Sequence, residues 1–189
     1  MMAGATGGFA RARRAATTFG KDRRGIAALE FALIAAPFFF LLFAIMETAL
    51  VFFISTTLEQ ATTQNARDIR TGNFQTAGGD AEQFRQEICE NGAGLLDCSK
   101  LRIDVRTWTS FAAINPSAPI DDDGELDDSE FGFDAGGPSC IVLVRVFYEY
   151  DVITPVLGPG LSNMSGNRRL LNAAAAFRNE PFPGAIPPC

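Results

Sequence analysis

The residues with the clearest chemical potential lie at the start of a long apolar segment. A basic pair, Arg23 and Arg24, precedes Gly25, and Glu30 follows five residues after that glycine. An acid in a membrane-spanning helix is unfavourable by about 2.5–3.5 kcal/mol at mid-bilayer, so Glu30 needs a partner or a function. Residues 23–31 are therefore the first candidate for a site.

The layout of residues 23–31 resembles the class III signal segment of type IV pilin-like proteins. In those proteins a prepilin peptidase cuts after the glycine on the cytoplasmic side and leaves the apolar helix attached. The resemblance implies that Gly25 and Ile26 form the processing site, with Arg23 and Arg24 as the basic end of the leader.

Cleavage after Gly25 would give Glu30 a partner. Ile26 would carry a free amine, and because Ile26 and Glu30 are spaced i, i+4, the two charges would share one helix face, about 6 Å apart along the axis. The positive end of the helix dipole favours the same carboxylate. In an assembled filament the amine of a neighbouring subunit could take this role. Alternatively, Glu30 is an interfacial side chain that reaches back to the lipid headgroups.

The apolar segment is long enough to cross a membrane. Residues 26–46 contain Glu30 as their only ionised side chain, and these 21 residues span about 31 Å as a helix. A cleaved secretory signal peptide would have a shorter apolar core and a small-residue cleavage site, which does not follow Ile54. We therefore predict a transmembrane helix over residues 26–54, with Glu47 at its outer interface or in a subunit contact.

Charge is distributed unevenly along the chain. Six basic residues against one acid give residues 1–24 a net charge of +5, which leaves −11 of the total of −6 for residues 25–189. By the positive-inside rule, residues 1–25 form a cytoplasmic leader and the acidic domain faces outward. No basic or aromatic pattern continues beyond the leader, so nucleic acid is not an expected partner.

All four cysteines follow the predicted anchor, on the side expected to be oxidising. Their even number suggests two disulfides, although four cysteines allow three connectivities. Pairing Cys89 with Cys98 would close a short Gly-rich loop and is the simplest arrangement, and it would leave Cys140 to pair with Cys189. Zinc is disfavoured because the chain has no histidine and no closely spaced cysteine pair.

The remaining patterns predict an α+β fold. Residues 55–71 extend the membrane helix and end at a Thr-Gly-Asn stop, with Leu58, Ala61, Asn65 and Ile69 on one packing face. A short helix capped by Asp80 covers residues 80–90. Strands are predicted over 101–111 and 140–152, with the second in the centre of the sheet. Residues 168–178 are ambiguous, because four successive alanines favour a helix, but a third strand is preferred since two strands alone are marginal. The aromatic residues Trp108, Phe111, Phe147, Tyr148 and Tyr150 are assigned to the core.

Enzymatic sites find little support. The chain lacks histidine, a P-loop and a G-x-S-x-G motif, so we expect no enzyme and no cofactor. The acidic residues 121–130 are a candidate calcium loop, but an EF-hand register would place Pro119 at the first ligand position. A solvated acidic loop is the favoured interpretation, and no metal site is assigned.

With these residues considered together, the chain resembles the TadE-like family, the minor pilins or pseudopilins of tight-adherence (Flp) pilus systems. The resemblance rests on residues 25–33, on Pro37, on Ala66-Arg67 and on the terminal residues 176–182. It implies a pilin-like architecture in which a long N-terminal transmembrane helix extends into a small antiparallel sheet domain over residues 72–189.

The resemblance also implies a function and a location. The expected protein is a minor pilin that acts in pilus assembly and surface adhesion, located in the bacterial inner membrane with a periplasmic C-terminal domain. Its expected partners are prepilin peptidase, other Tad/Flp pilins, the inner-membrane assembly platform and the lipid bilayer. The alternative is an unprocessed single-pass assembly factor of the Tad secretion machinery.

Overall fold

Helix α2 (Ile26–Thr71) opens the described part of the chain and is 46 residues long. The structure is a computed structural model, and it describes residues 26–92, 94–114, 119–154, 157–183, 187 and 189. The leader, including Arg23, Arg24 and Gly25, lies outside the described residues. The chain divides into two compact units, residues 1–45 and residues 46–189.

In the first unit, the described residues are those of α2 up to Ile45. Their large apolar side chains are exposed, including Phe31 and Leu33, and the helix continues through Pro37. By length and composition, α2 is the one helix in the described residues that could cross a membrane. This agrees with the predicted span.

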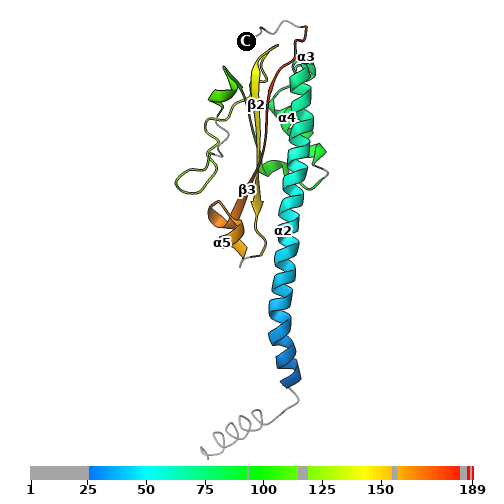
Figure 1. Cartoon of the computed structure of the whole chain (residues 1–189), viewed down its shortest axis with the longest axis vertical. Helices are drawn as coiled ribbons and strands as arrows, with labels where there is room; N and C mark the ends of the chain where they lie inside the picture. The colour runs from blue at the N-terminus through cyan, green and yellow to red at the C-terminus, as the bar shows by residue number, and fades with distance from the viewer. Residues whose placement is uncertain (1–25, 93, 115–118, 155–156, 184–186, 188) are drawn as a thin grey trace, which may run out of the picture. The chain divides into compact units, whose positions relative to one another are not determined.

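The second unit is an α+β domain around a three-stranded antiparallel sheet, as predicted (Figure 1). The strand order is β1-β2-β3, which places β2 in the centre. Val144 of β2 pairs with Val105 on one side and Ala175 on the other. The strands and the other helices are β1 (Leu101–Trp108), β2 (Ile141–Asp151), β3 (Arg168–Arg178), α3 (Asn73–Thr76), α4 (Ala81–Asn91) and α5 (Gly158–Leu161).

Helix α2 ends where the sequence predicts. Gly72 adopts φ +80°, a left-handed conformation that L side chains rarely adopt, and its N–H donates to the Ile69 carbonyl at 3.1 Å. A Cβ at this position would lie 2.2 Å from the Phe182 ring. The Asp80 side chain accepts a hydrogen bond from Gln83 N at 2.9 Å and caps α4, also as predicted.

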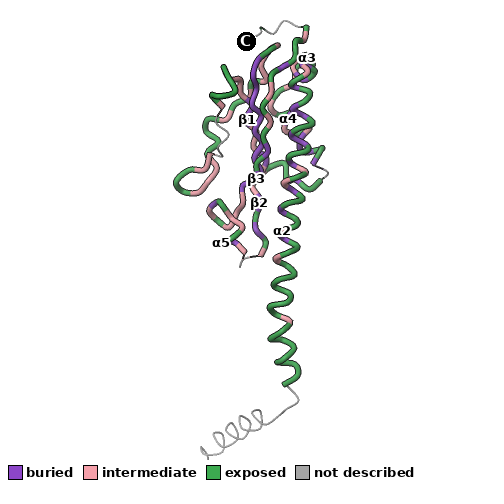
Figure 2. Tube along the Cα trace, viewed as in Figure 1, coloured by how far each residue is buried: buried purple, intermediate pink, exposed green. Residues whose placement is uncertain are grey.

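Both faces of β2 are covered, as its nearly continuous apolar sequence predicts. On one face, Val142, Val144 and Val146 join a core that includes residues of α2 and α4. On the other, Phe147 packs with Met164 and Leu170 beneath apolar residues of the loop that precedes β2. Figure 2 shows buried residues concentrated along the strands and at intervals on α2. The predicted packing face of α2 is confirmed, since Leu58, Ala61, Asn65 and Ile69 are all buried.

Two local expectations for β1 were wrong. The strand ends at Trp108, and Phe111 lies in a short 3₁₀ helix with 51% of its surface exposed, so it is not a core residue. The alternation from Leu101 to Val105 is interrupted because Asp104 is buried, 1% exposed. A carboxylate can be buried in this way only with charged or hydrogen-bonding partners, which are described below.

Candidate functional site

The predicted charge-pairing residues lie on the first turns of α2. Ile26 is the first helical residue, and its spacing from Glu30 places both on one face of the helix. The Glu30 side chain is exposed and has no hydrogen bond or ion pair to another described residue. Gly25, the other half of the predicted processing site, lies outside the described residues. The carboxylate is therefore available to an amine at Ile26 or on another molecule.

Glu47 is the first buried residue of α2 and has a different environment. It is 5% exposed, and its two carboxylate oxygens accept hydrogen bonds from the backbone N–H groups of Ile153 and Thr154, the latter at 2.9 Å. Those residues follow β2, more than 100 positions away in the sequence. This carboxylate attaches the end of β2 to the helix.

The position of Glu47 could have been found in the sequence. Glu47, Val51, Ile54 and Leu58 are spaced by four, three and four residues, and all are buried against the domain. Tyr150 lies in the same environment. Burial, and after it the negative charge of Glu47, raises the pKa of the Tyr150 phenol.

Two disulfides brace the domain, as the even cysteine count predicts. One joins Cys89 at the end of α4 to Cys98, just before β1. The other joins Cys140 at the start of β2 to Cys189, 49 residues later. This is the arrangement in which the short Gly-rich loop is closed, and no described cysteine is free.

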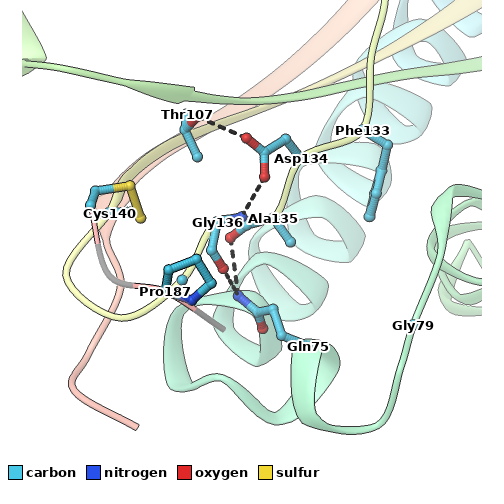
Figure 3. Close-up of a pocket in the computed structure, with 11 residues that line it drawn as sticks. Gln75, Gly79, Thr107, Phe133, Asp134, Ala135, Gly136, Cys140 and Pro187 are labelled. Carbon is cyan, nitrogen blue, oxygen red and sulfur yellow. Dashed lines mark hydrogen bonds between the residues drawn. A yellow bond between two sulfur atoms is a disulfide. The ribbon is translucent and has the colours of Figure 1, made fainter. Parts of the chain in front are cut away.

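A cleft of about 480 Å³ lies beside the second disulfide (Figure 3). Thr107, Asp134 and the Gln75 Nε2 amide have hydrogen-bond partners in the fold, whereas Gln75 Oε1 is buried without one. Asp134 accepts from Thr107 Oγ1 at 2.8 Å and from Gly136 N at 3.0 Å, and Gln75 Nε2 donates to the carbonyl of Ala135 at 3.0 Å. These hydrogen bonds hold the loop at residues 134–136 against β1 and α3.

A buried charge cluster crosses the sheet. Asp104 accepts from Arg145 Nη2 and from Arg106 Nε, both at 2.7 Å, and from Gly132 N at 3.0 Å. Burial alone would raise the pKa of Asp104, but the hydrogen bonds from Arg106, Arg145 and Gly132 together hold this pKa below its usual value. The Arg145 guanidinium also lies 5.5 Å from the centre of the Phe147 ring. The cluster fixes β1, β2 and the loop at Gly132 to one another.

The acidic loop is used within the domain. Glu125 contacts Ser165 and Arg168, and these hydrogen bonds, Ser165 first, lower the pKa of Glu125. Asp121 accepts from the N–H groups of Asp123 and Glu125 at 3.0 and 2.8 Å and so organises the turn. Within the part of the chain that the structure describes, no three metal-ligating side chains gather in one place.

The comparison with known families bears on α2. The family described as TadE-like protein matches residues 25–67. The N-terminal segment is TadE-like. The matched residues begin at Gly25 and contain Ile26, Glu30 and Glu47, and the family is one of pilus-associated structural proteins, not enzymes. This confirms the predicted resemblance over residues 25–67, and the TadE-like segment suggests a Tad pilus-associated protein. No curated protein and no solved structure matches the chain.

Proposed function

We propose that this protein is a minor pilin or pseudopilin of a Tad (Flp) pilus. Prepilin peptidase cuts it between Gly25 and Ile26, and the mature subunit passes from the inner membrane into a surface filament, where it acts in assembly and adhesion. The observation that carries the proposal is the TadE-like match over residues 25–67, which begins at the predicted cut.

The state of Glu30 supports this proposal. In the described residues the carboxylate lacks an intramolecular partner although it lies in the apolar part of α2. An unpaired carboxylate is unfavourable in lipid, and an ammonium beside it offsets part of that cost. Cleavage after Gly25 supplies that ammonium on Ile26 of the same chain or of a neighbouring subunit. Removal of the leader therefore creates the ammonium group with which Glu30 pairs.

The charge distribution supports the topology. A leader of net charge +5 remains in the cytoplasm, and α2 crosses the inner membrane. The domain that contains both disulfides then lies in the oxidising periplasm. Its partners are prepilin peptidase, the other Tad pilins and the inner-membrane assembly platform.

Cleavage is tested by measuring the mass of the cellular protein with and without the peptidase. We expect loss of residues 1–25 in wild type and retention of the leader in Gly25→Ala or in cells without the peptidase. Recovery of an intact N-terminus from cells with active peptidase would favour the alternative, an unprocessed single-pass assembly factor.

The role of Glu30 is tested by Glu30→Gln, with Glu59→Gln as a matched control on an exposed site of the same helix. We expect Glu30→Gln to be cleaved normally but to be lost from sheared pilus fractions, while Glu59→Gln is incorporated. Equal incorporation of both variants would contradict the charge-pairing argument.

A further inference from the structure

The exposed face of α2 changes from apolar to polar side chains within the second unit. Met46, Phe52 and Phe53 are 60%, 69% and 58% exposed. From Thr56 onward the exposed positions are polar, among them Glu59 and Gln60. Exposed phenylalanines are unfavourable in water, whereas polar side chains are not. The boundary between the apolar and the polar surface of α2 therefore lies just beyond Phe53.

The domain begins to pack on α2 before that boundary. Glu47, Val51 and Ile54 are buried on the inner face of the helix while Phe52 and Phe53 are exposed on the outer face. The overlap covers residues 47–53, about 10 Å of helix. Glu47 does not mark the edge of the membrane, because its charge is hydrogen-bonded inside the domain and is not in solvent.

The loop held by Glu47 carries its own apolar side chain. Ile153 donates its backbone N–H to Glu47, and its side chain is 71% exposed. Figure 1 shows the end of β2 beside the same part of α2. The exposed Ile153 side chain therefore lies beside the part of α2, residues 47–53, whose outer face is apolar.

From these observations we infer that the part of the domain around residues 47–53 and Ile153 lies in the interfacial region of the membrane. Leu50, Phe52, Phe53 and Ile153 are then in contact with lipid. In the sequence of α2, Leu50, Phe52 and Phe53 follow directly on the apolar residues of the predicted span. Residues 26–53 measure about 42 Å as a helix, longer than a hydrocarbon core of about 30 Å but equal to the core plus its headgroup layers, about 40–45 Å. Lipid therefore covers this surface. The hydrogen bonds from Ile153 and Thr154 to Glu47 determine how deeply the loop after β2 enters the membrane. The inference rests on the proposed membrane insertion of α2.

Depth-dependent tryptophan quenching tests the inference on the full chain. Trp108 is the only native tryptophan, so Trp108→Phe gives a clean background. Single tryptophans are then placed by F53W and I153W, with F39W as a deep reference and Q60W, seven residues beyond Phe53, as the matched polar control. Each protein is reconstituted in phosphatidylcholine–phosphatidylglycerol vesicles with nitroxide-labelled lipids, labelled either at the headgroup or along the chain.

We expect F53W and I153W to be quenched several-fold more than Q60W, most strongly by labels near the headgroup, and F39W most strongly by labels deep in the chain. Adding Glu47→Ala should reduce quenching of I153W but leave F53W unchanged. Quenching of F39W with none at F53W or I153W would overturn this inference alone, whereas no quenching at F39W would overturn membrane insertion as well. Shielding of I153W from aqueous acrylamide that grows with protein density, without lipid quenching, would also overturn it and identify a second copy as the occupant.

Discussion

Removing the Asp104 carboxylate is the most informative perturbation of the domain. Asp104 is 1% exposed and accepts hydrogen bonds from Arg145, Arg106 and the N–H of Gly132. Asp104→Ala removes the buried carboxylate that accepts two hydrogen bonds from the Arg145 guanidinium. Breaking one side of a buried pair costs about 3–5 kcal/mol, and for a domain of this size the melting temperature should fall by roughly 10–15 °C.

The assay is thermal unfolding of the detergent-solubilised full chain, followed by near-UV circular dichroism. The control is Asp128→Ala, which breaks the exposed pair of Arg102 and Asp128 at 3.2 Å and should lower stability by only about 0.2–1 kcal/mol. Adding Arg145→Met to Asp104→Ala removes the buried guanidinium as well and should recover part of the loss. If Asp104→Ala and Asp128→Ala melt within about 2 °C of each other, the cluster does not stabilise the fold as we argue.

The same residue predicts a pH dependence with a definite sign. The folded-state pKa of Asp104 is lowered from its ordinary value of 3.8. Its contribution to stability is therefore present above that ordinary value and is lost as the pH falls through the folded-state pKa. Acid titration of wild type should show a stability loss beginning near pH 4, and Asp104→Ala should flatten that part of the profile. Parallel acid profiles would contradict the assignment.

Three further predictions concern other parts of the second unit. Cys140→Ser removes the disulfide that closes a loop of 49 residues and should cost about 4 kcal/mol of stability on the chain-entropy estimate. Cys89→Ser removes the disulfide that closes the shorter loop and should cost about 3 kcal/mol. Chemical denaturation should therefore find Cys140→Ser the less stable of the two variants. Gly72→Ala should lower the melting temperature because a Cβ meets the Phe182 ring and the backbone there is left-handed, whereas alanine at Gly94, which has open space, should show the backbone effect alone. In a Tyr148→Phe protein, absorbance at high pH should show Tyr150 ionising above its ordinary pKa of 10.0. The stability of the fold should decline as the pH rises past that value. Ionisation of Tyr150 at or below pH 10.0 would contradict the argument that burial raises its pKa.

Local patterns were sufficient to predict most elements of the fold. The length of α2 follows from an uninterrupted apolar and then amphipathic pattern that ends at Gly72, and α4 follows from the Asp80 cap. The strand β3 contains four successive alanines, which favour helix by propensity. Its pairing with β2 decides the outcome, because tertiary contacts outweigh differences of a few tenths of a kcal/mol per residue.

The buried polar contacts could not be predicted in the same way. Asp104 and Arg145 are 41 residues apart, and only the register of β1 against β2 places them opposite each other. Glu47 meets a loop more than 100 residues later, at the end of β2. The sequence places each acid on an element and a face, but the partner depends on how elements distant in the chain are assembled.

The two acids in the apolar part of α2 show how one helix can serve both folding and assembly. Both oxygens of Glu47 accept hydrogen bonds from backbone N–H groups of its own domain, and the side chain is buried there. Glu30 has no partner among the described residues, and it lies in the first of the two units. Under the proposed function, Glu30 is therefore the carboxylate that pairs with a new ammonium at Ile26 or on a neighbour. Substitutions at the two positions should therefore affect different properties. Glu47 variants should change the stability of the domain, and Glu30 variants should change incorporation into the filament.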